Sequence, residues 1–491
     1  MVAVQPGPPT GILPATLWAA LATAVLSGLL LGEGIGINLL LVAVPAVLAA
    51  AFAARAAGRR IRPWTMAWAV GGSALLAVPA LRDAGWPTFL ASATALALGS
   101  LALHGGRTWR GTLLGSIGVV GAFVPGTRWA WQGIRERADG SRDRWVPIFR
   151  TAGAAIALLV VFGALFAGAD AAFADLINGL APDVSVGDSP ARVFFFLLGL
   201  FGALAVARTA AAPMRWDRIE GTPGRPRARL EWALPLVVLN ALFAAFIAVQ
   251  LAVLLGGYDK VLSETGLSYA QYARQGFWQL LWATLLTLVV IALALRWAPR
   301  GAQRDRTLVR GVLGTLSALT LVVVVSALRR MDLYVDAYGL TRLRVSVVGV
   351  EMWLGLVIAL IMVAGVVGGR WLPRAVVGSA AAAVLAFGLL SPDGLVAEQN
   401  VQRYERDGKI DLAYLEQLSA DAVPALDRLP KHLRACALRG IEDDLGPDDE
   451  PWYATSIGEA RARRILTERP VPAITAPCGT ASRYDELRDS G

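Results

Sequence analysis

The feature that most constrains this chain is a series of apolar runs of about 20 residues, separated by short stretches rich in arginine. About 20 apolar residues cross a bilayer as a helix, because lipid cannot satisfy exposed backbone groups. Of the 491 residues, 56% are hydrophobic and 17% are charged, whereas soluble domains average about 25% charged residues. The pattern excludes a collagen-like, disordered or disulfide-scaffold protein and argues against a cytosolic enzyme.

Eleven runs are predicted to span the membrane, within a range of ten to twelve. They cover residues 12–31, 36–54, 64–81, 86–103, 152–168, 191–212, 232–255, 277–298, 307–328, 346–367 and 375–390. We expect the first run to be a retained anchor, because no Lys or Arg precedes it as in a secretory signal. The apolar stretch 111–124 has only 14 residues, so we expect it to be interfacial or re-entrant.

The predicted fold class is all-α: a polytopic transmembrane helical bundle with a small, all-helical, soluble C-terminal domain. We expect N-terminal membrane helices with a cytoplasmic Arg-rich loop over residues 1–145, a core membrane domain over 146–390 and the soluble domain over 391–491. Residues 391–491 hold 13 basic and 19 acidic side chains, whereas residues 1–390 carry a net charge of +15. Because the arginines flank apolar spans, they indicate membrane orientation rather than a nucleic-acid partner.

Arginine also predicts which side of the membrane each loop occupies, since cytoplasmic loops are enriched in basic residues. With a cytoplasmic N-terminus, the predicted cytoplasmic loops hold 25 basic residues and the opposite loops hold 8. An odd number of spans then puts the C-terminal domain outside the cytoplasm. In that oxidising compartment, Cys436 and Cys478 could form a disulfide; two unrelated buried thiols are the alternative.

Ionisable and polar residues inside the spans are the first site candidates, because a charge in hydrocarbon is costly. Glu351 lies near the start of span 346–367, and Arg344 precedes it by two helical turns on the same face. Asn240 adds a polar group to span 232–255. These residues predict either hydrogen bonds that fasten helices together or a polar conduit between the two spans.

Residues 328–345 form the most distinctive segment, LRRMDLYVDAYGLTRLRV. Gly339 fits a helix end and Thr341 a helix start. The segment carries four arginines in a predicted outer loop, which breaks the charge rule. We therefore expect partners for them: nearby acids, the acidic C-terminal domain or lipid phosphate. The candidate residues are Asp332, Tyr334, Asp336, Tyr338, Arg342 and Arg344.

Catalytic motifs are scarce. The chain contains no HExxH, GxSxG or CxxC motif and no P-loop, and residues 32–36 (GEGIG) resemble a membrane-loop turn more than a nucleotide fingerprint. Asp170 and Asp175 follow the fifth predicted span; such acids can perform acid–base catalysis but are usually just solvated. We expect no catalytic residue, cofactor or metal site, and favour a non-enzymatic role.

The sequence resembles a bacterial family of multi-pass membrane proteins, domain of unknown function 4173, and its sister family 4153. The resemblance rests on RMDLYVDAYGLTRLR at 330–344, GADAAFAD at 168–175, Asn400, DLAYL at 411–415 and LSADAVPAL at 418–426. It extends over roughly residues 150–430, so hydropathy alone supports the first four spans. It implies a membrane protein with a helical tail and no established reaction, ligand or catalytic residue.

These observations predict an integral protein of the bacterial plasma membrane with a role in envelope sensing or assembly. Its extracytoplasmic helical tail would dock on the Tyr- and Arg-rich outer loop. The expected partners are the lipid bilayer and an envelope or membrane protein. One alternative is a transporter or channel with a polar intramembrane site around Glu351, and another is a membrane-embedded envelope enzyme.

Overall fold

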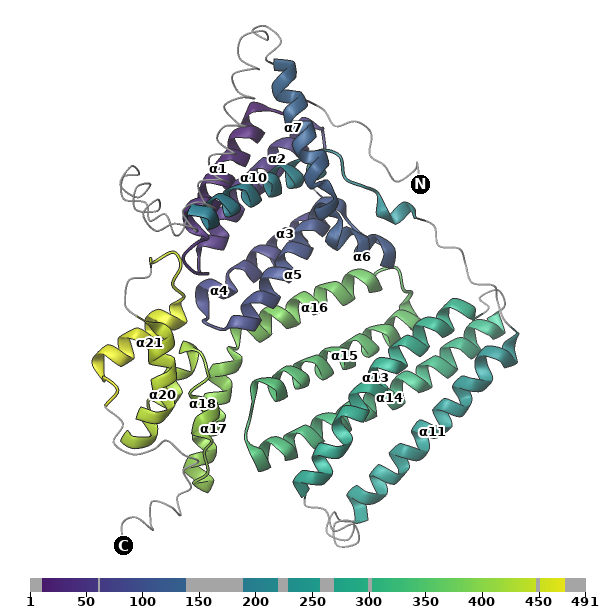
Figure 1. Ribbon diagram of the computed structural model, residues 1–491. Helices are drawn as coiled ribbons and strands as arrows, with labels where there is room; N and C mark the ends of the chain where they lie inside the picture. Colours follow the sequence, from purple (N-terminus) through teal and green to yellow (C-terminus); the bar gives the residue numbers. More distant parts are fainter. Residues whose placement is uncertain are drawn as a thin grey trace, which may run out of the picture. The chain divides into compact units, whose positions relative to one another are not determined.

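The computed structural model describes residues 11–60, 62–137, 189–219, 228–256, 269–298, 303–446 and 451–472. Its regular elements are helices, which confirms the all-α class (Figure 1). The chain divides into two compact units. The first draws on Met1–Asp83, Thr88–Ile219 and Pro447–Ala460, and the second on Ala84–Pro87, Glu220–Gly446 and Arg461–Gly491.

Nine helical segments in the described part of the chain are long and apolar enough to cross a bilayer, so this is a multi-pass membrane protein. They are α2 (Asn38–Ala56), α3 with α4 (Pro63–Leu76 and Val78–Leu81), α5 (Gly85–His104), α10 (Ser189–Ala211), α11 (Arg229–Gly256), α13 (Tyr269–Trp297), α14 (Gln303–Tyr338), α15 (Arg342–Val367) and α16 (Leu372–Leu389). The apolar helix α1 (Pro14–Leu30) is shorter, with 17 residues. Ten predicted spans thus coincide with helices, while the predicted span 152–168 lies outside the described residues.

The stretch 111–124 does not form one continuous helix. It is divided among α6 (Trp109–Ile117), the 3-10 helix η2 (Gly118–Ala122) and the start of α7 (Phe123–Arg137). Neither α6 nor α7 is long enough to be one of the nine candidate spans.

Small side chains allow the helices of the first unit to pack closely. Helices α1, α2 and α10 contact one another, and α7 packs on α10. A Cβ atom on Gly28 of α1 would lie 3.1 Å from the Arg192 carbonyl oxygen and 3.2 Å from Phe196 Cβ, both on α10. Close backbone approach through small residues is the usual way for helices to associate in lipid. The apolar core of this unit is rich in alanine, including Ala20, Ala49, Ala53, Ala203 and Ala207.

In the second unit, α14 contacts α11, α13 and α15, and α15 contacts α16 (Figure 1). Helix α14 has 36 residues, or about 54 Å at 1.5 Å per residue, which exceeds a hydrocarbon core of about 30 Å. Its charged end therefore continues the helix beyond the apolar span 307–328, up to the helix end predicted at Gly339. The predicted stop and start are confirmed: α14 ends at Tyr338, Gly339 has φ +79°, and Thr341 caps α15.

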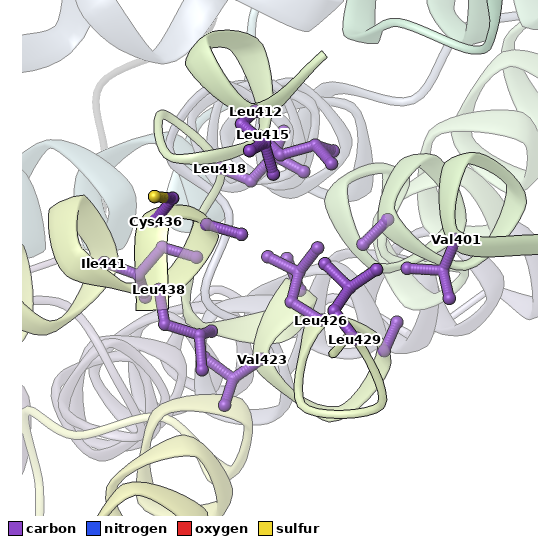
Figure 2. Close-up of a cluster of buried hydrophobic side chains, with 14 of the residues drawn as sticks. Val401, Leu412, Leu415, Leu418, Val423, Leu426, Leu429, Cys436, Leu438 and Ile441 are labelled. Atoms are coloured by element: carbon purple, nitrogen blue, oxygen red, sulfur yellow. The ribbon is translucent and has the colours of Figure 1, made fainter. Parts of the chain in front are cut away.

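The C-terminal domain consists of short helices, as predicted: α17 (Pro392–Asp407), α18 (Leu412–Leu415), the 3-10 helix η6 (Ala420–Ala422), α19 (Val423–Leu426), α20 (Lys431–Leu445) and α21 (Ile457–Glu468). Asp411 caps α18, accepting the Tyr414 N–H at 3.2 Å. Leucines from several of these segments meet in one core, together with Cys436 (Figure 2). Cys436 is 1% exposed and disulfide-bonded. Its predicted partner Cys478 lies outside the described residues, so the pairing itself stays a prediction.

Candidate functional site at the connection between α14 and α15

Arg342, the first residue of α15, binds the C-terminal domain through a bidentate ion pair. Its Nε and Nη2 donate to the Asp393 Oδ1 and Oδ2 at 2.7 and 2.6 Å. The Asp393 side chain is 5% exposed and that of Arg342 is 38% exposed, so the pair lies at the edge of the contact. Two parallel N–H···O bonds fix the relative direction of the two groups as well as their distance.

Three more side chains of the domain bind the backbone around Gly339. Asn400 Nδ2 donates to the Leu340 carbonyl at 2.8 Å, and Arg403 Nη2 donates to the Ala337 carbonyl at 2.6 Å. The Arg342 N–H donates to the Tyr414 hydroxyl at 2.7 Å. These bonds satisfy backbone groups left over at the end of α14 and the start of α15, which have no partner within their own helices.

The local sequence around Asp393 explains its position. Ser391 adopts φ +51°, which is uncommon for a residue other than glycine. The Ser391 hydroxyl donates to Asp421 Oδ2 at 2.5 Å and accepts the Gly394 N–H at 3.3 Å as the cap of α17. Asp393 therefore sits in the first turn of α17, where a negative charge is favourable. Its Oδ2 also accepts the Ser419 N–H at 2.9 Å.

Burial raises the pKa of Tyr414, and the nearby Arg342 opposes that rise. The hydroxyl therefore stays protonated at neutral pH while its oxygen accepts the Arg342 N–H. Leu340 and Val345 pack against the core of the C-terminal domain, so the contact combines apolar burial with directional bonds.

The other predicted residues of this segment have different surroundings. The Arg344 guanidinium lies 4.2 Å above the centre of the Tyr334 ring and donates to the Gly339 carbonyl. The rings of Tyr334 and Tyr338 meet edge to face, with centroids 5.1 Å apart. Asp332 and Asp336 are exposed. Among the partners expected for the arginines, the structure pairs Arg342 with the C-terminal domain.

The intramembrane polar residues contact separate neighbours. Glu351 is fully buried, and its Oε1 lies 3.1 Å from the Thr284 hydroxyl on α13. Asn240 Nδ2 on α11 donates to the Val312 carbonyl on α14 at 3.0 Å. Gln250 Oε1, also on α11, accepts from the Ser326 hydroxyl. Arg344 and Glu351 thus have different partners, although α15 does extend through both. Asp170 and Asp175 lie outside the described residues.

A second contact of the C-terminal segment occurs within the first unit. Glu33, between α1 and α2, accepts from Arg192 Nη2 at 2.9 Å and from the Tyr453 hydroxyl at 3.0 Å. The Asn38 N–H donates to the Tyr453 carbonyl at 3.1 Å. Gly36 permits this approach, because a Cβ there would lie 2.9 Å from the Ala454 backbone. The GEGIG segment is therefore a turn that receives residues 453–454.

Sequence reasoning did not predict Asn400, Arg403, Tyr414 or Asp393 as partners of the α14–α15 connection. Asp393 directly follows Ser391-Pro392, a pattern that is typical of a helix start. This pattern does not reveal that Asp393 binds Arg342, which lies 51 residues earlier in the sequence. Among the residues that the structure describes, no group of His, Cys, Asp and Glu side chains could hold a metal ion.

Comparison with known proteins identifies the family. Residues 70–429 match the family model for a domain of unknown function, DUF4153. The match begins well before residue 150, so it includes most of the third and fourth predicted spans, which the resemblance had left out. No curated protein and no solved structure matches the chain. The likeness to family 4173 stays a prediction. Because the match covers more than half of its length, this chain belongs to the DUF4153 family.

Proposed function

We propose that this protein acts in the bacterial plasma membrane as a non-enzymatic component of envelope sensing or assembly. Its C-terminal domain lies outside the cytoplasm and stays bound to the connection between α14 and α15. The observation that carries the proposal is the bidentate Arg342–Asp393 pair, reinforced by Tyr414, Asn400 and Arg403. A domain bound by so few polar contacts can be released or retained by a partner that competes for them.

Contacts inside each unit agree with the proposed grouping of loops onto the same side of the membrane, while the arginine count carries the choice of side. In the first unit, Glu33, in a loop predicted outside, contacts Arg192, at the end of α10 that is predicted to face outside. Arg59, between α2 and α3, donates to the Ala210 carbonyl near the end of α10, and both are predicted cytoplasmic. In the second unit, the C-terminal domain, which follows α16, contacts the connection between α14 and α15 through Asp393 and Arg342. Both are predicted outside. All three contacts agree with the arginine-based assignment of sides.

Limited proteolysis from outside spheroplasts tests the docking. Arg342→Gln removes the bidentate pair, so a protease added outside should cleave within residues 391–446 several-fold faster than in the wild type. Arg329→Gln is the matched control, because Arg329 is exposed on α14 in the same segment and has no described contact with the C-terminal domain.

Equal cleavage rates for Arg342→Gln, Arg329→Gln and the wild type would contradict the docking role. Protection of the domain until the membrane is permeabilised would contradict the extracytoplasmic location instead. The two failures are therefore distinguishable in one experiment.

Proton-coupled transport is a second candidate, favoured by one observation at Glu351. The Thr284 hydroxyl lies 3.1 Å from both the Leu280 carbonyl and Glu351 Oε1, yet a hydroxyl has one proton to donate. A protonated Glu351 could donate to Thr284, which could then donate to Leu280. Glu351 Oε2 has no hydrogen-bond partner among the described residues, so the carboxyl has an oxygen available for a transferred proton.

Proteoliposomes test this second candidate. An imposed pH gradient should collapse faster with the wild type than with Glu351→Gln, while Thr284→Ser, which keeps the hydroxyl, should behave as the wild type. Identical decay in wild-type, Glu351→Gln and protein-free liposomes would exclude proton movement through this carboxyl.

A further inference from the structure

A groove on the first unit lies between α7 and α10. It is an open depression of about 390 Å³, lined by Thr127, Arg128, Ala130, Trp131, Ile134, Phe201 and Leu204. Most of its lining is apolar, with one guanidinium and one hydroxyl from adjacent residues of α7. Trp131, Ile134 and Phe201 are 50%, 45% and 37% exposed, so the apolar walls are accessible.

Close packing fixes both walls of this groove. A Cβ on Gly126 of α7 would lie 2.9 Å from the Leu204 carbonyl oxygen of α10, so the two backbones touch there. Farther along α7, Gly133 lies against the Ile12 side chain. Trp129 and Ala130 of α7 are 7% and 4% exposed and belong to the apolar core that contains Ala203 and Leu204. The groove is therefore a feature of the packed unit rather than of a loose helix.

The groove lies near the C-terminal end of α10, which carries Arg208. Arg59 donates to the Ala210 carbonyl, six residues beyond Leu204, which is about 9 Å along a helix. Arg59 and Arg128 are both exposed, and their positive charge attracts anionic lipid headgroups. Tryptophan favours the same interfacial layer of the membrane. Arg128 is exposed and no ion pair is described for it, so its charge is available to a ligand.

We propose that this groove binds one anionic phospholipid from the cytoplasmic leaflet. The Arg128 guanidinium contacts the headgroup phosphate, Trp131 and Ile134 lie beside the headgroup, and an acyl chain lies against Phe201 and Leu204. The Thr127 hydroxyl donates to the Val124 carbonyl at 2.9 Å and so has no proton left for the phosphate. An anionic lipid fits better than a zwitterionic one, because Arg128 gives the groove a positive charge and none of its lining residues is a carboxylate.

Lipid-dependent thermal stability of the purified full-length protein tests this site. A ligand that binds only the folded state raises the melting temperature. Phosphatidylglycerol in detergent micelles should raise the Tm of the wild type more than phosphatidylcholine does. Arg128→Gln should lose most of that difference, with phosphatidylglycerol bound about fivefold more weakly. Arg135→Gln, which removes the same charge from the same helix outside the groove, should keep it.

Native mass spectrometry gives a second readout in case Arg128→Gln lowers stability by itself. The wild type and Arg135→Gln should retain one phosphatidylglycerol molecule more often than Arg128→Gln, and Arg128→Lys should restore part of the retention. Equal stabilisation by the two lipids in the wild type, or equal lipid retention by Arg128→Gln and Arg135→Gln, would overturn the proposal.

Discussion

Arg342 and Arg344 stand two residues apart at the start of α15 and have different partners. Arg342 binds Asp393 of the C-terminal domain, whereas Arg344 stays with Tyr334 and the Gly339 carbonyl of its own connection. A side chain on a helix turns by about 100° per residue, so two positions two residues apart face different neighbours.

A double-mutant cycle separates these roles. Arg342→Gln and Asp393→Asn should show a coupling free energy of about 1–2 kcal/mol. This is less than for a fully buried pair, because solvent partly screens Arg342. The free energy of opening of α17, from amide hydrogen exchange in detergent, is the quantity to measure. The cycle of Arg344→Gln with Asp393→Asn should give a coupling near zero. Equal coupling in both cycles would contradict the assignment.

Glu398 provides a pH-dependent test within the C-terminal domain. Its hydrogen bond from Arg428, at 2.7 Å, lowers the pKa of the carboxyl below its ordinary value. A carboxyl with a lowered pKa stabilises the folded state above its unfolded pKa, about 4.3, and loses that contribution as the pH falls through the folded value. Because both side chains are exposed, the contribution is about 0.2–1 kcal/mol.

The expected result is a small Tm deficit of Glu398→Gln that is constant at pH values well above the unfolded pKa of about 4.3 and fades as the pH falls through the lowered pKa of the folded state. Glu405→Gln, on the exposed side of the same helix, is the matched control, since no ion pair is described for Glu405. A deficit that grows on acidification, or one shared equally by both variants, would contradict this linkage.

Sequence reasoning at the residue scale located Arg342 and Glu351 but not their partners. Membrane depth makes a buried Glu351 conspicuous, because a charge is costly there. Tertiary folding alone brings Asp393 to Arg342 and Thr284 to Glu351, and nothing in the spacing of either pair encodes the contact.

At the element scale, hydropathy located the described spans within a few residues, because the thickness of the hydrocarbon determines their length. It did not predict that α3 ends at Leu76 and α4 begins at Val78. Pro79 has no N–H and its ring clashes with the preceding turn, which interrupts the helix there. Hydropathy alone also ends α14 at residue 328, because a polar helical end carries no apolar signal; the helix end at Gly339 was predicted from residue type instead.

Two glycines in helices give a prediction at this scale. A Cβ on Gly440 of α20 would collide with the Glu416 carbonyl oxygen at the end of α18, whereas one on Gly314 of α14 would meet nothing within 4 Å. Gly440→Ala should destabilise the protein by about 1–3 kcal/mol through overpacking. Gly314→Ala should stabilise it by about 0.5–1 kcal/mol through helix propensity. Thermal unfolding of both variants in the same detergent measures the contrast; a similar Tm change for both would refute the close α18–α20 packing.

At the scale of the whole molecule, the uneven arginine distribution predicted which side of the membrane each loop occupies. The acidic C-terminal domain was predicted to bind the arginine-bearing outer loop, and both predictions are part of the function that we propose. Each described helix-end contact agrees with these predictions: Glu33 with Arg192, Arg59 with Ala210, and Arg342 with Asp393. The activity could not be predicted in the same way, because membership in DUF4153 brings no described reaction and the polar residues in the spans have separate neighbours.

The most direct test of the central claim is cysteine labelling on intact cells that express the full-length protein. Glu405→Cys places a thiol on exposed α17, and Arg304→Cys places one at the exposed start of α14. A membrane-impermeant maleimide should label Glu405→Cys on intact cells and Arg304→Cys only after permeabilisation, with little labelling of the wild type. Labelling of Arg304→Cys on intact cells, with Glu405→Cys protected, would contradict the account.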